Sequence, residues 1–146
     1  LVVLDNSTTA MTGHQPHPGT GKNMMGQVVD KVSIEDTLHG IGVKTVEIVN
    51  PLHLQEAIDC VKRVAVQDGV KAIIFKSPCA VLIKSGKPAQ IEESKCIQCK
   101  KCIRTLGCPA IMLQDGKVQI EQALCTGCGL CAQVCPTAAI GGACHA

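Results

Sequence analysis

The feature that most constrains this 146-residue chain is the position of its cysteines. Nine of the eleven fall in residues 96–146, whereas Cys60 and Cys79 lie before them. The chain has one Phe and neither Trp nor Tyr, so a conventional aromatic core is excluded. We therefore expect two units, the second of which is held together by cysteine chemistry instead of a large apolar core.

The cysteine-rich part is an internal repeat. Gln90-Ile91-Glu92 recurs 29 residues later as Gln119-Ile120-Glu121, and each copy continues into a cysteine triplet and then Cys-Pro. The second copy reads C-x2-C-x2-C-x3-C-P, and the first reads C-x2-C-x2-C-x5-C-P. The first of these runs is typical of bacterial iron–sulfur proteins, in which the fourth cysteine binds the other cluster. The spacing therefore predicts two 4Fe–4S clusters.

This crosswise pattern assigns four cysteines to each cluster. The expected ligands are Cys96, Cys99, Cys102 and Cys135 for the first cluster, and Cys125, Cys128, Cys131 and Cys108 for the second. A zinc site would leave the third cysteine of each triplet unexplained, and disulfides need an oxidising compartment, for which no secretory signal is visible. The two extra residues before Cys108 enlarge the loop beside the second cluster. Gly127 and Gly129 let the backbone approach the sulfides.

Residues 1–84 are expected to form part of a parallel α/β domain. Apolar runs at 1–4, 43–49 and 70–75 predict strands, and 80–83 is a further candidate. Ser33 is expected to cap one helix, and Asn50-Pro51 to begin a second that ends at Gly69. Alternation of strand and helix at this spacing favours a parallel sheet. Because the chain opens directly on a strand, we expect it to be the C-terminal part of a longer protein.

The segment Ser85-Gly86-Lys87-Pro88 is the expected boundary, which gives domains 1–84 and 85–146. The predicted fold class is α/β, with a small α+β ferredoxin-like domain after the boundary. The net charge of +2 and the lack of aromatic residues argue against nucleic-acid binding. No apolar run is long enough to span a membrane. We expect a cytoplasmic protein without membrane contact.

The loop at residues 6–27 is the second candidate site. It follows the first strand, at the edge of a parallel sheet where ligands bind. Asn6 offers a hard oxygen ligand for Mg²⁺, and threonine hydroxyls and backbone groups can donate to a diphosphate. An ordinary surface loop is the alternative. A phosphate-binding P-loop at Gly19-Thr20-Gly21-Lys22 is excluded, because Pro16 and Asn23 break its pattern.

A family resemblance adds to this interpretation. The stretch LDNSTTAMTGHQPHPGTG at residues 4–21, Ser77-Pro78-Cys79-Ala80 and the two-cluster tail resemble the 2-oxoacid:ferredoxin oxidoreductases, in particular the alpha subunit of the indolepyruvate type. The resemblance implies the end of a thiamine-diphosphate-binding domain. It also implies that Asn6 binds Mg²⁺ by its side chain and Thr8 by its carbonyl. Further implied cofactor-binding residues are Thr12, Gly13 and Gln15.

His14 and His17 are predicted to be catalytic residues that face substrate or cofactor, the alternative being hydrogen bonds within the loop. For His39, His53 and His145 we expect surface or locally satisfied roles. Cys60 is expected to be a buried thiol, whereas Cys79 and Cys144 have no partner motif. Three cations form a basic patch on the first cluster loop, which is either a solvated face or a docking surface for an acidic ferredoxin. They are Lys100, Lys101 and Arg104.

The function implied by the resemblance is oxidative decarboxylation of arylpyruvates to aryl-acetyl-CoA. Electrons would pass through the two clusters to ferredoxin, and a beta subunit and coenzyme A would complete the reaction. This stretch alone should be inactive, since such enzymes build their site between two domains. Two alternatives stay open: another 2-oxoacid:ferredoxin oxidoreductase, and a non-enzymatic iron–sulfur electron-transfer module.

Overall fold

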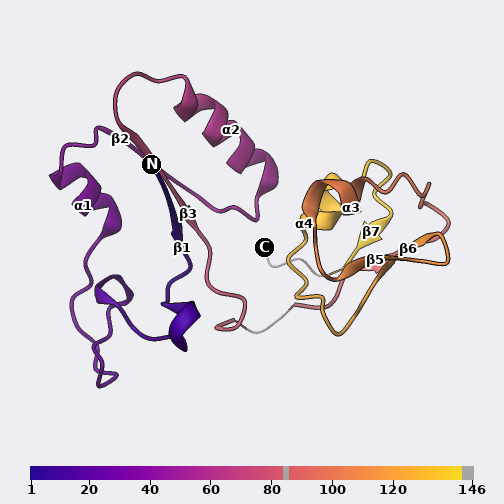
Figure 1. Ribbon diagram of the computed structural model, residues 1–146, viewed down its shortest axis with the longest axis horizontal. Helices are drawn as coiled ribbons and strands as arrows, with labels where there is room; N and C mark the ends of the chain where they lie inside the picture. Colours follow the sequence, from indigo (N-terminus) through magenta and orange to yellow (C-terminus); the bar gives the residue numbers. More distant parts are fainter. Residues whose placement is uncertain (84–85, 143–146) are drawn as a thin grey trace. The chain divides into compact units, whose positions relative to one another are not determined.

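The computed structural model describes residues 1–83 and 86–142. The chain divides into two compact units, Leu1–Ile83 and Lys84–Ala146 (Figure 1). The sequence-based expectations for Ser85, Cys144 and His145 lie outside the described residues. None of the helices in the described part of the chain is long and apolar enough to cross a membrane.

The first unit contains a three-stranded parallel sheet. Its strands are β1 (Val2–Asp5), β2 (Thr45–Val49) and β3 (Lys71–Lys76), in the spatial order β1-β3-β2. In the central strand, Ile74 lies opposite Val3 on one side and Ile48 on the other. Strands joined through helices must run parallel when each crossover returns the chain to the same edge. The predicted parallel sheet is therefore present in this unit.

Helices α1 (Ile34–Gly40) and α2 (Leu54–Ala65) cover opposite faces of this sheet (Figure 1). Successive side chains of a strand point to opposite faces, so β3 contributes to both cores. Ile74, which is 2% exposed, packs with Leu38 and Val43 on the α1 side. Ile73 packs with Cys60 and Val64 on the α2 side. The alternation explains why an almost continuous apolar run forms the central strand.

The helix starts differ in how well the sequence predicts them. Ser33 caps α1 as expected, because its Oγ accepts a hydrogen bond from the Asp36 N–H at 3.1 Å. The prediction that Asn50 caps the second helix is wrong, since α2 begins at Leu54 after His53. Asn50 Oδ1 accepts from the Leu52 N–H at 3.0 Å, and its carbonyl accepts from the His53 N–H at 3.1 Å. The side chain thus closes a separate turn before the helix.

The predicted strand at residues 80–83 is also wrong. These residues form a turn that begins at Cys79, whose carbonyl accepts a hydrogen bond from the Leu82 N–H at 2.8 Å. The apolar run Ala80-Val81-Leu82-Ile83 is short, and periodicity alone does not distinguish a strand from a turn over four residues. β3 is thus the last strand of the first unit's sheet.

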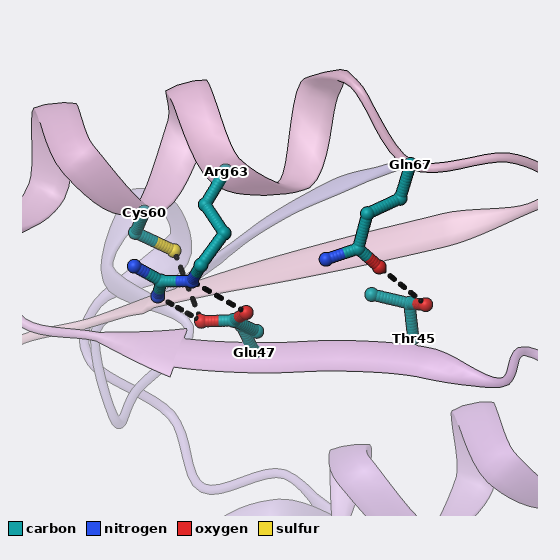
Figure 2. A network of polar contacts seen from close by, with 5 residues as sticks. All are labelled: Thr45, Glu47, Cys60, Arg63 and Gln67. Carbon is teal, nitrogen blue, oxygen red and sulfur yellow. Dashed lines mark hydrogen bonds and ion pairs between the residues drawn. The ribbon is translucent and has the colours of Figure 1, made fainter.

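A polar network ties α2 to β2 (Figure 2). Arg63 donates from Nε to Glu47 Oε1 at 3.1 Å and from Nη2 to Oε2 at 2.5 Å. These hydrogen bonds lower the pKa of the Glu47 carboxyl. The buried Cys60 thiol donates to the same carboxylate at 3.7 Å, and burial raises its pKa. Cys60 is therefore the buried thiol that the sequence predicts, with a structural contact.

We expect this ion pair to contribute modestly to stability. The Arg63 side chain is 57% exposed, so solvent screens the attraction, and a double-mutant cycle with Glu47→Gln and Arg63→Met should give a coupling of about 0.5–1 kcal/mol. Urea unfolding followed by circular dichroism measures it. The coupling should fall in 1 M NaCl, because the Debye length shrinks to about 3 Å. A coupling near zero at low salt would contradict the stabilising role.

The second unit consists of two copies of one small motif. Helices α3 (Lys101–Leu106) and α4 (Leu130–Val134) are joined by two antiparallel strand pairs. The pairs are β4 (Gln90–Ile91) with β7 (Ile140–Gly141), and β5 (Ile111–Gln114) with β6 (Lys117–Ile120). Each pair joins the start of one copy to the end of the other.

The 29-residue offset found in the sequence persists in the pairing. Ile91 lies opposite Ile140, and Ile120 lies opposite Ile111. The offset is the same on both sides, so the two extra residues before Cys108 are balanced by two fewer between Cys108 and the next strand. The β5–β6 hairpin was not predicted. Its tip is Asp115-Gly116, with φ of 50° and 78°, the pattern of a type I′ turn.

Candidate functional site

The eight predicted cluster cysteines surround two cavities in the second unit. The larger cavity, about 300 Å³, is lined by the four cysteines predicted for the second cluster, Cys108, Cys125, Cys128 and Cys131. Leu106, Ile111 and Leu130 contribute apolar walls. The triplet and the Cys-Pro cysteine of the opposite copy are thus brought together.

The smaller cavity is lined by the other predicted set, Cys96, Cys99, Cys102 and Cys135. Its volume is about 20 Å³, which is room for little more than one water molecule. The loop that carries the first triplet must therefore open when an eight-atom Fe₄S₄ core assembles there. Both cavities follow the crosswise pattern, since each one combines a triplet with a cysteine of the other copy.

The donor set suits iron–sulfur clusters. In the described residues, no three Cys, His, Asp or Glu side chains lie close enough to hold one metal ion. A zinc ion would draw its thiolates to about 4 Å from one another, given Zn–S bonds of about 2.3 Å. In a 4Fe–4S cluster each thiolate binds a different iron, which suits thiols spread around a cavity. Thiolate donors in apolar surroundings are the ligands that these clusters use.

The two triplet loops share one backbone conformation. The helix after each triplet loop is preceded by a residue with left-handed backbone, Lys100 with φ of 59° and Gly129 with φ of 77°. Two residues earlier, Gln98 and Gly127 have φ of 52° and 72°. Glycine adopts this conformation without cost, whereas Lys and Gln pay for it. Two left-handed residues thus direct each triplet around its cavity, although only the second copy shows this in its sequence.

Backbone N–H groups point at two of the sulfur atoms. The Ala89 N–H donates to Cys125 Sγ at 3.4 Å, and the Ala139 N–H donates to Cys135 Sγ at 3.3 Å. Both alanines are buried. Hydrogen bonds to cluster sulfurs help to set the reduction potential. The sequence analysis missed these donors, and the small residue next to strands β4 and β7 is the signal that was available.

The thiol pKa values follow the same geometry. Burial raises the pKa of Cys131 to about 11 and also raises that of Cys102. Burial acts on Cys135 in the same direction, but hydrogen bonds from Thr137, Ala139 and Ile140 outweigh it and lower its pKa. Ligating thiols must lose their protons, so Cys135 is prepared for that loss by its own loop.

Residues 86–89 pack on the second triplet loop. The Gly86 N–H donates to the Thr126 carbonyl at 3.1 Å. A Cβ atom at Gly127 would lie 2.6 Å from the Lys87 carbonyl oxygen, so only glycine fits there. The Gln122 side chain also donates to the Ala89 carbonyl at 3.1 Å. This segment, which the sequence analysis treated as a boundary, is therefore part of the wall beside the second cavity.

In the first unit, the predicted cofactor loop begins where β1 ends. Asn6 Oδ1 accepts a hydrogen bond from the Thr8 N–H at 3.2 Å, and the Asn6 carbonyl accepts from the Cys79 N–H at 2.9 Å. Thr8 is 8% exposed. An amide oxygen has two lone pairs, so Asn6 Oδ1 retains capacity for a cation. The Asn6 side chain thus fits the role of a Mg²⁺ ligand, and the loop holds it in place.

The loop then turns back on itself at residues 9–15. The Thr9 N–H donates to the Gln15 carbonyl at 3.1 Å, and Thr12 Oγ1 donates to Gln15 Oε1 at 3.3 Å. A short 3-10 helix, Ala10–Thr12, ends at Gly13, which has φ of 95°. The loop therefore brings the predicted residues Thr12, Gly13 and Gln15 together. Thr12 and Gln15 are exposed, so both reach solvent.

The two histidines of this loop are placed differently. His17 precedes a second 3-10 helix, Pro18–Thr20, and its Nδ1 accepts from the Gly19 N–H at 3.1 Å. This is the loop hydrogen bond that the sequence analysis offered as the alternative, and Nε2 is the nitrogen that remains for another role. His14 is half-buried, with φ of 61°.

The remaining histidines and Cys79 have local contacts. His39 Nδ1 lies 2.9 Å from the Val43 carbonyl oxygen, and His53 Nδ1 lies 3.2 Å from Glu56 Oε2. Both therefore have the local partners that the sequence analysis favoured. Cys79 is half-buried beside the start of the cofactor loop, where its N–H binds Asn6.

Comparison with known proteins agrees with this geometry. Residues 89–141 match the family model of the 4Fe-4S dicluster domain. The chain is 44% identical over 146 residues to the indolepyruvate oxidoreductase subunit IorA of Archaeoglobus fulgidus, and 42% identical over 142 residues to that of Methanothermobacter marburgensis. Each alignment covers 96% of this chain and 23% of the relative. The chain thus spans about a quarter of the length of these relatives.

A shorter similarity involves the second unit's kind of domain. Over 50 residues, 34% of this chain, it is 42% identical to the pyruvate synthase subunit PorD of Methanothermobacter marburgensis, and covers 58% of that protein. The match to IorA subunits extends far beyond this domain and includes both units. We conclude that residues 89–141 are a 4Fe–4S dicluster domain, in a chain that is homologous over nearly its whole length to part of the indolepyruvate oxidoreductase subunit IorA.

Proposed function

We propose that this chain is the iron–sulfur part of a cytoplasmic 2-oxoacid:ferredoxin oxidoreductase that acts on arylpyruvates. The observation that carries the proposal is the grouping of eight cysteines around two cavities in a 4Fe–4S dicluster domain. The relatives named indolepyruvate oxidoreductase support an arylpyruvate as substrate. Coenzyme A and a beta subunit are the further partners that this function requires.

In this proposal, Cys96, Cys99, Cys102 and Cys135 hold one cluster, and Cys125, Cys128, Cys131 and Cys108 hold the other. The clusters would supply one-electron redox chemistry, which suits ferredoxin as an acceptor of single electrons. The protein's contribution is to place the two sites side by side in one small domain and to keep water away with apolar walls. The N–H groups of Ala89 and Ala139 would stabilise negative charge on the bound sulfurs.

The cofactor loop has a separate role in the proposal. Thiamine diphosphate, when bound with Mg²⁺, would supply the electron sink for decarboxylation. Asn6 would bind Mg²⁺ through Oδ1 and Thr8 through its carbonyl, while Thr12, Gly13 and Gln15 would line the cofactor. His17, with Nδ1 held by the Gly19 N–H, presents Nε2 in a fixed orientation. His14 and His17 would face the substrate.

The test is Asn6→Ala in the complete subunit together with its beta subunit. We expect thiamine-dependent decarboxylation of indolepyruvate to fall at least about 100-fold, because a missing metal ligand weakens cofactor binding and orientation. The iron content should stay at about eight per chain. Asn50→Ala is the matched control, since Asn50 closes a similar turn in the same unit. Unchanged decarboxylation in Asn6→Ala would contradict the assignment of the loop.

The substrate class needs its own measurement. Initial rates with indolepyruvate, phenylpyruvate, pyruvate and 2-oxobutyrate, with reduction of ferredoxin as the readout, compare the two families of substrate. We expect the aryl substrates to have the higher kcat/KM. A preference for the short aliphatic acids would assign the chain to another 2-oxoacid:ferredoxin oxidoreductase.

A further inference from the structure

The surfaces above the two cluster sites differ in charge. Three exposed cations lie on the loop and helix of the first triplet, namely Lys100, Lys101 and Arg104. The positions 29 residues later carry no charge, namely Gly129, Leu130 and Gln133. The repeat therefore provides an internal comparison: one backbone motif, with and without a basic surface.

The three cations are not neutralised by carboxylates. In residues 86–142, the described ion pairs are Lys95 with Glu92 at 2.6 Å and Lys117 with Glu93 at 3.6 Å. Arg104 donates to the Cys99 carbonyl at 2.6 Å, which orients its guanidinium and leaves the charge in place. The basic patch therefore projects a positive potential into solvent.

The patch is continuous with the wall of the first cavity. Ile97 and Lys100 line the cavity that holds Cys96, Cys99, Cys102 and Cys135. Ile97 is also 65% exposed. A protein that docks on these two side chains would be separated from the cluster by them alone. Because electron transfer slows steeply with distance, this is a favourable place for an electron to leave the domain.

The second cavity is closed by contrast. Its lining contains no charged residue. The segment at residues 86–89 packs on its loop through the Gly86–Thr126 hydrogen bond and the bond from the Ala89 N–H to Cys125. Gly127 and Gly129 are buried, whereas Lys100 is exposed. The two cluster sites are thus alike in ligands and unlike in access.

From this asymmetry we infer that the surface made by Ile97, Lys100, Lys101 and Arg104 is the docking site for a small acidic electron-carrier protein. Electrons would leave the chain through the first cluster, and the inference rests on the proposed electron-transfer function. An exposed apolar side chain with cations around it matches the general structure of protein interfaces, an apolar centre with a polar rim. Charge complementarity identifies the partner as acidic.

The experiment measures binding between an acidic ferredoxin and the chain with both clusters loaded, by isothermal titration calorimetry in 0.05 M and 0.5 M NaCl. We expect the double variant Lys100→Glu/Lys101→Glu to weaken the affinity about tenfold or more at low salt. The difference should shrink to about twofold at high salt, where screening is strong. Ile97→Ala should weaken binding by a factor that salt does not change, because it removes apolar contact.

The matched control is Lys44→Glu/Lys62→Glu, which changes the net charge equally at exposed positions of the first unit. It should leave the affinity within about twofold of the parent chain. Equal weakening by both double variants would overturn the docking site, because net charge alone would then explain the effect. Lys100→Gln/Lys101→Gln replaces the reversal if that variant loses iron.

Iron content separates this inference from the function on which it rests. A parent chain that holds about eight iron atoms but does not bind the acidic ferredoxin would overturn the docking site and leave the two-cluster function standing. A parent chain without iron would overturn the proposed function itself. Salt-dependent binding that Lys100→Glu/Lys101→Glu removes and the control does not would support the inference.

Discussion

Replacing Gly127 with alanine is expected to remove the second cluster and leave the first in place. The new Cβ would lie 2.6 Å from the Lys87 carbonyl oxygen and 3.0 Å from the Gly86 carbonyl carbon. Both are backbone atoms, so no side-chain rotation relieves the clash. The left-handed φ of 72° adds about 1–2 kcal/mol for any residue with a Cβ. Separation of residues 86–89 from the loop would also remove the Ala89 N–H from Cys125.

The measurement is iron and sulfide content together with the unfolding midpoint. We expect about four iron atoms in Gly127→Ala and about eight in the parent chain. Gly116→Ala is the matched control, because Gly116 has φ of 78° and its Cβ would meet nothing within 4 Å. It carries the backbone strain without the clash, and should retain both clusters. Equal iron content and equal stability in the two variants would contradict the role of the close contact.

Pairs of cysteine substitutions are expected to show the crosswise assignment through iron content alone. If Cys99 and Cys135 serve the same cluster, Cys99→Ala/Cys135→Ala should retain about four iron atoms. Cys128→Ala/Cys135→Ala removes a ligand from each cluster, and should retain almost none. The physical reason is that a cubane with three thiolates leaves one iron open to solvent and is lost readily.

The opposite result has an equally clear meaning. If each triplet used the Cys-Pro cysteine of its own copy, Cys128→Ala/Cys135→Ala would keep about four iron atoms and Cys99→Ala/Cys135→Ala would lose nearly all. Cys60→Ala serves as the control, because Cys60 is buried in the first unit and bonded to Glu47. It should retain about eight iron atoms, since it belongs to neither set.

Local signals explain which parts of the fold were predictable. Ser33 caps α1 because a hydroxyl three residues before a free N–H is enough to form that bond. The cysteine spacing and the 29-residue offset likewise fix which residues must recur. The two strand pairs follow the same offset. A repeat thus carries long-range information that a single strand does not, since each copy constrains the other.

The errors arise where a local pattern is compatible with two structures. Asn50 can cap a helix or close a turn with the same side-chain oxygen. Ala80-Val81-Leu82-Ile83 is apolar enough for a strand, but the described residues form a turn there. The site shows the same limit. Nothing in the residue types indicates that Gln98 and Lys100 adopt left-handed backbone, and nothing local indicates that Ala89 would donate to Cys125.

The crosswise arrangement also has a consequence for how the domain is made on the ribosome. In the proposed assignment, the first cluster needs Cys135, which is synthesised 27 residues after Cys108. At about 5–20 residues per second, the nascent chain displays Cys96, Cys99, Cys102 and Cys108 for about 1–5 s before their correct partners exist. Iron delivered in that interval would meet the wrong fourth thiol. Loading is therefore best delayed until Ile140 can pair with Ile91, so that translation finishes before the metal arrives.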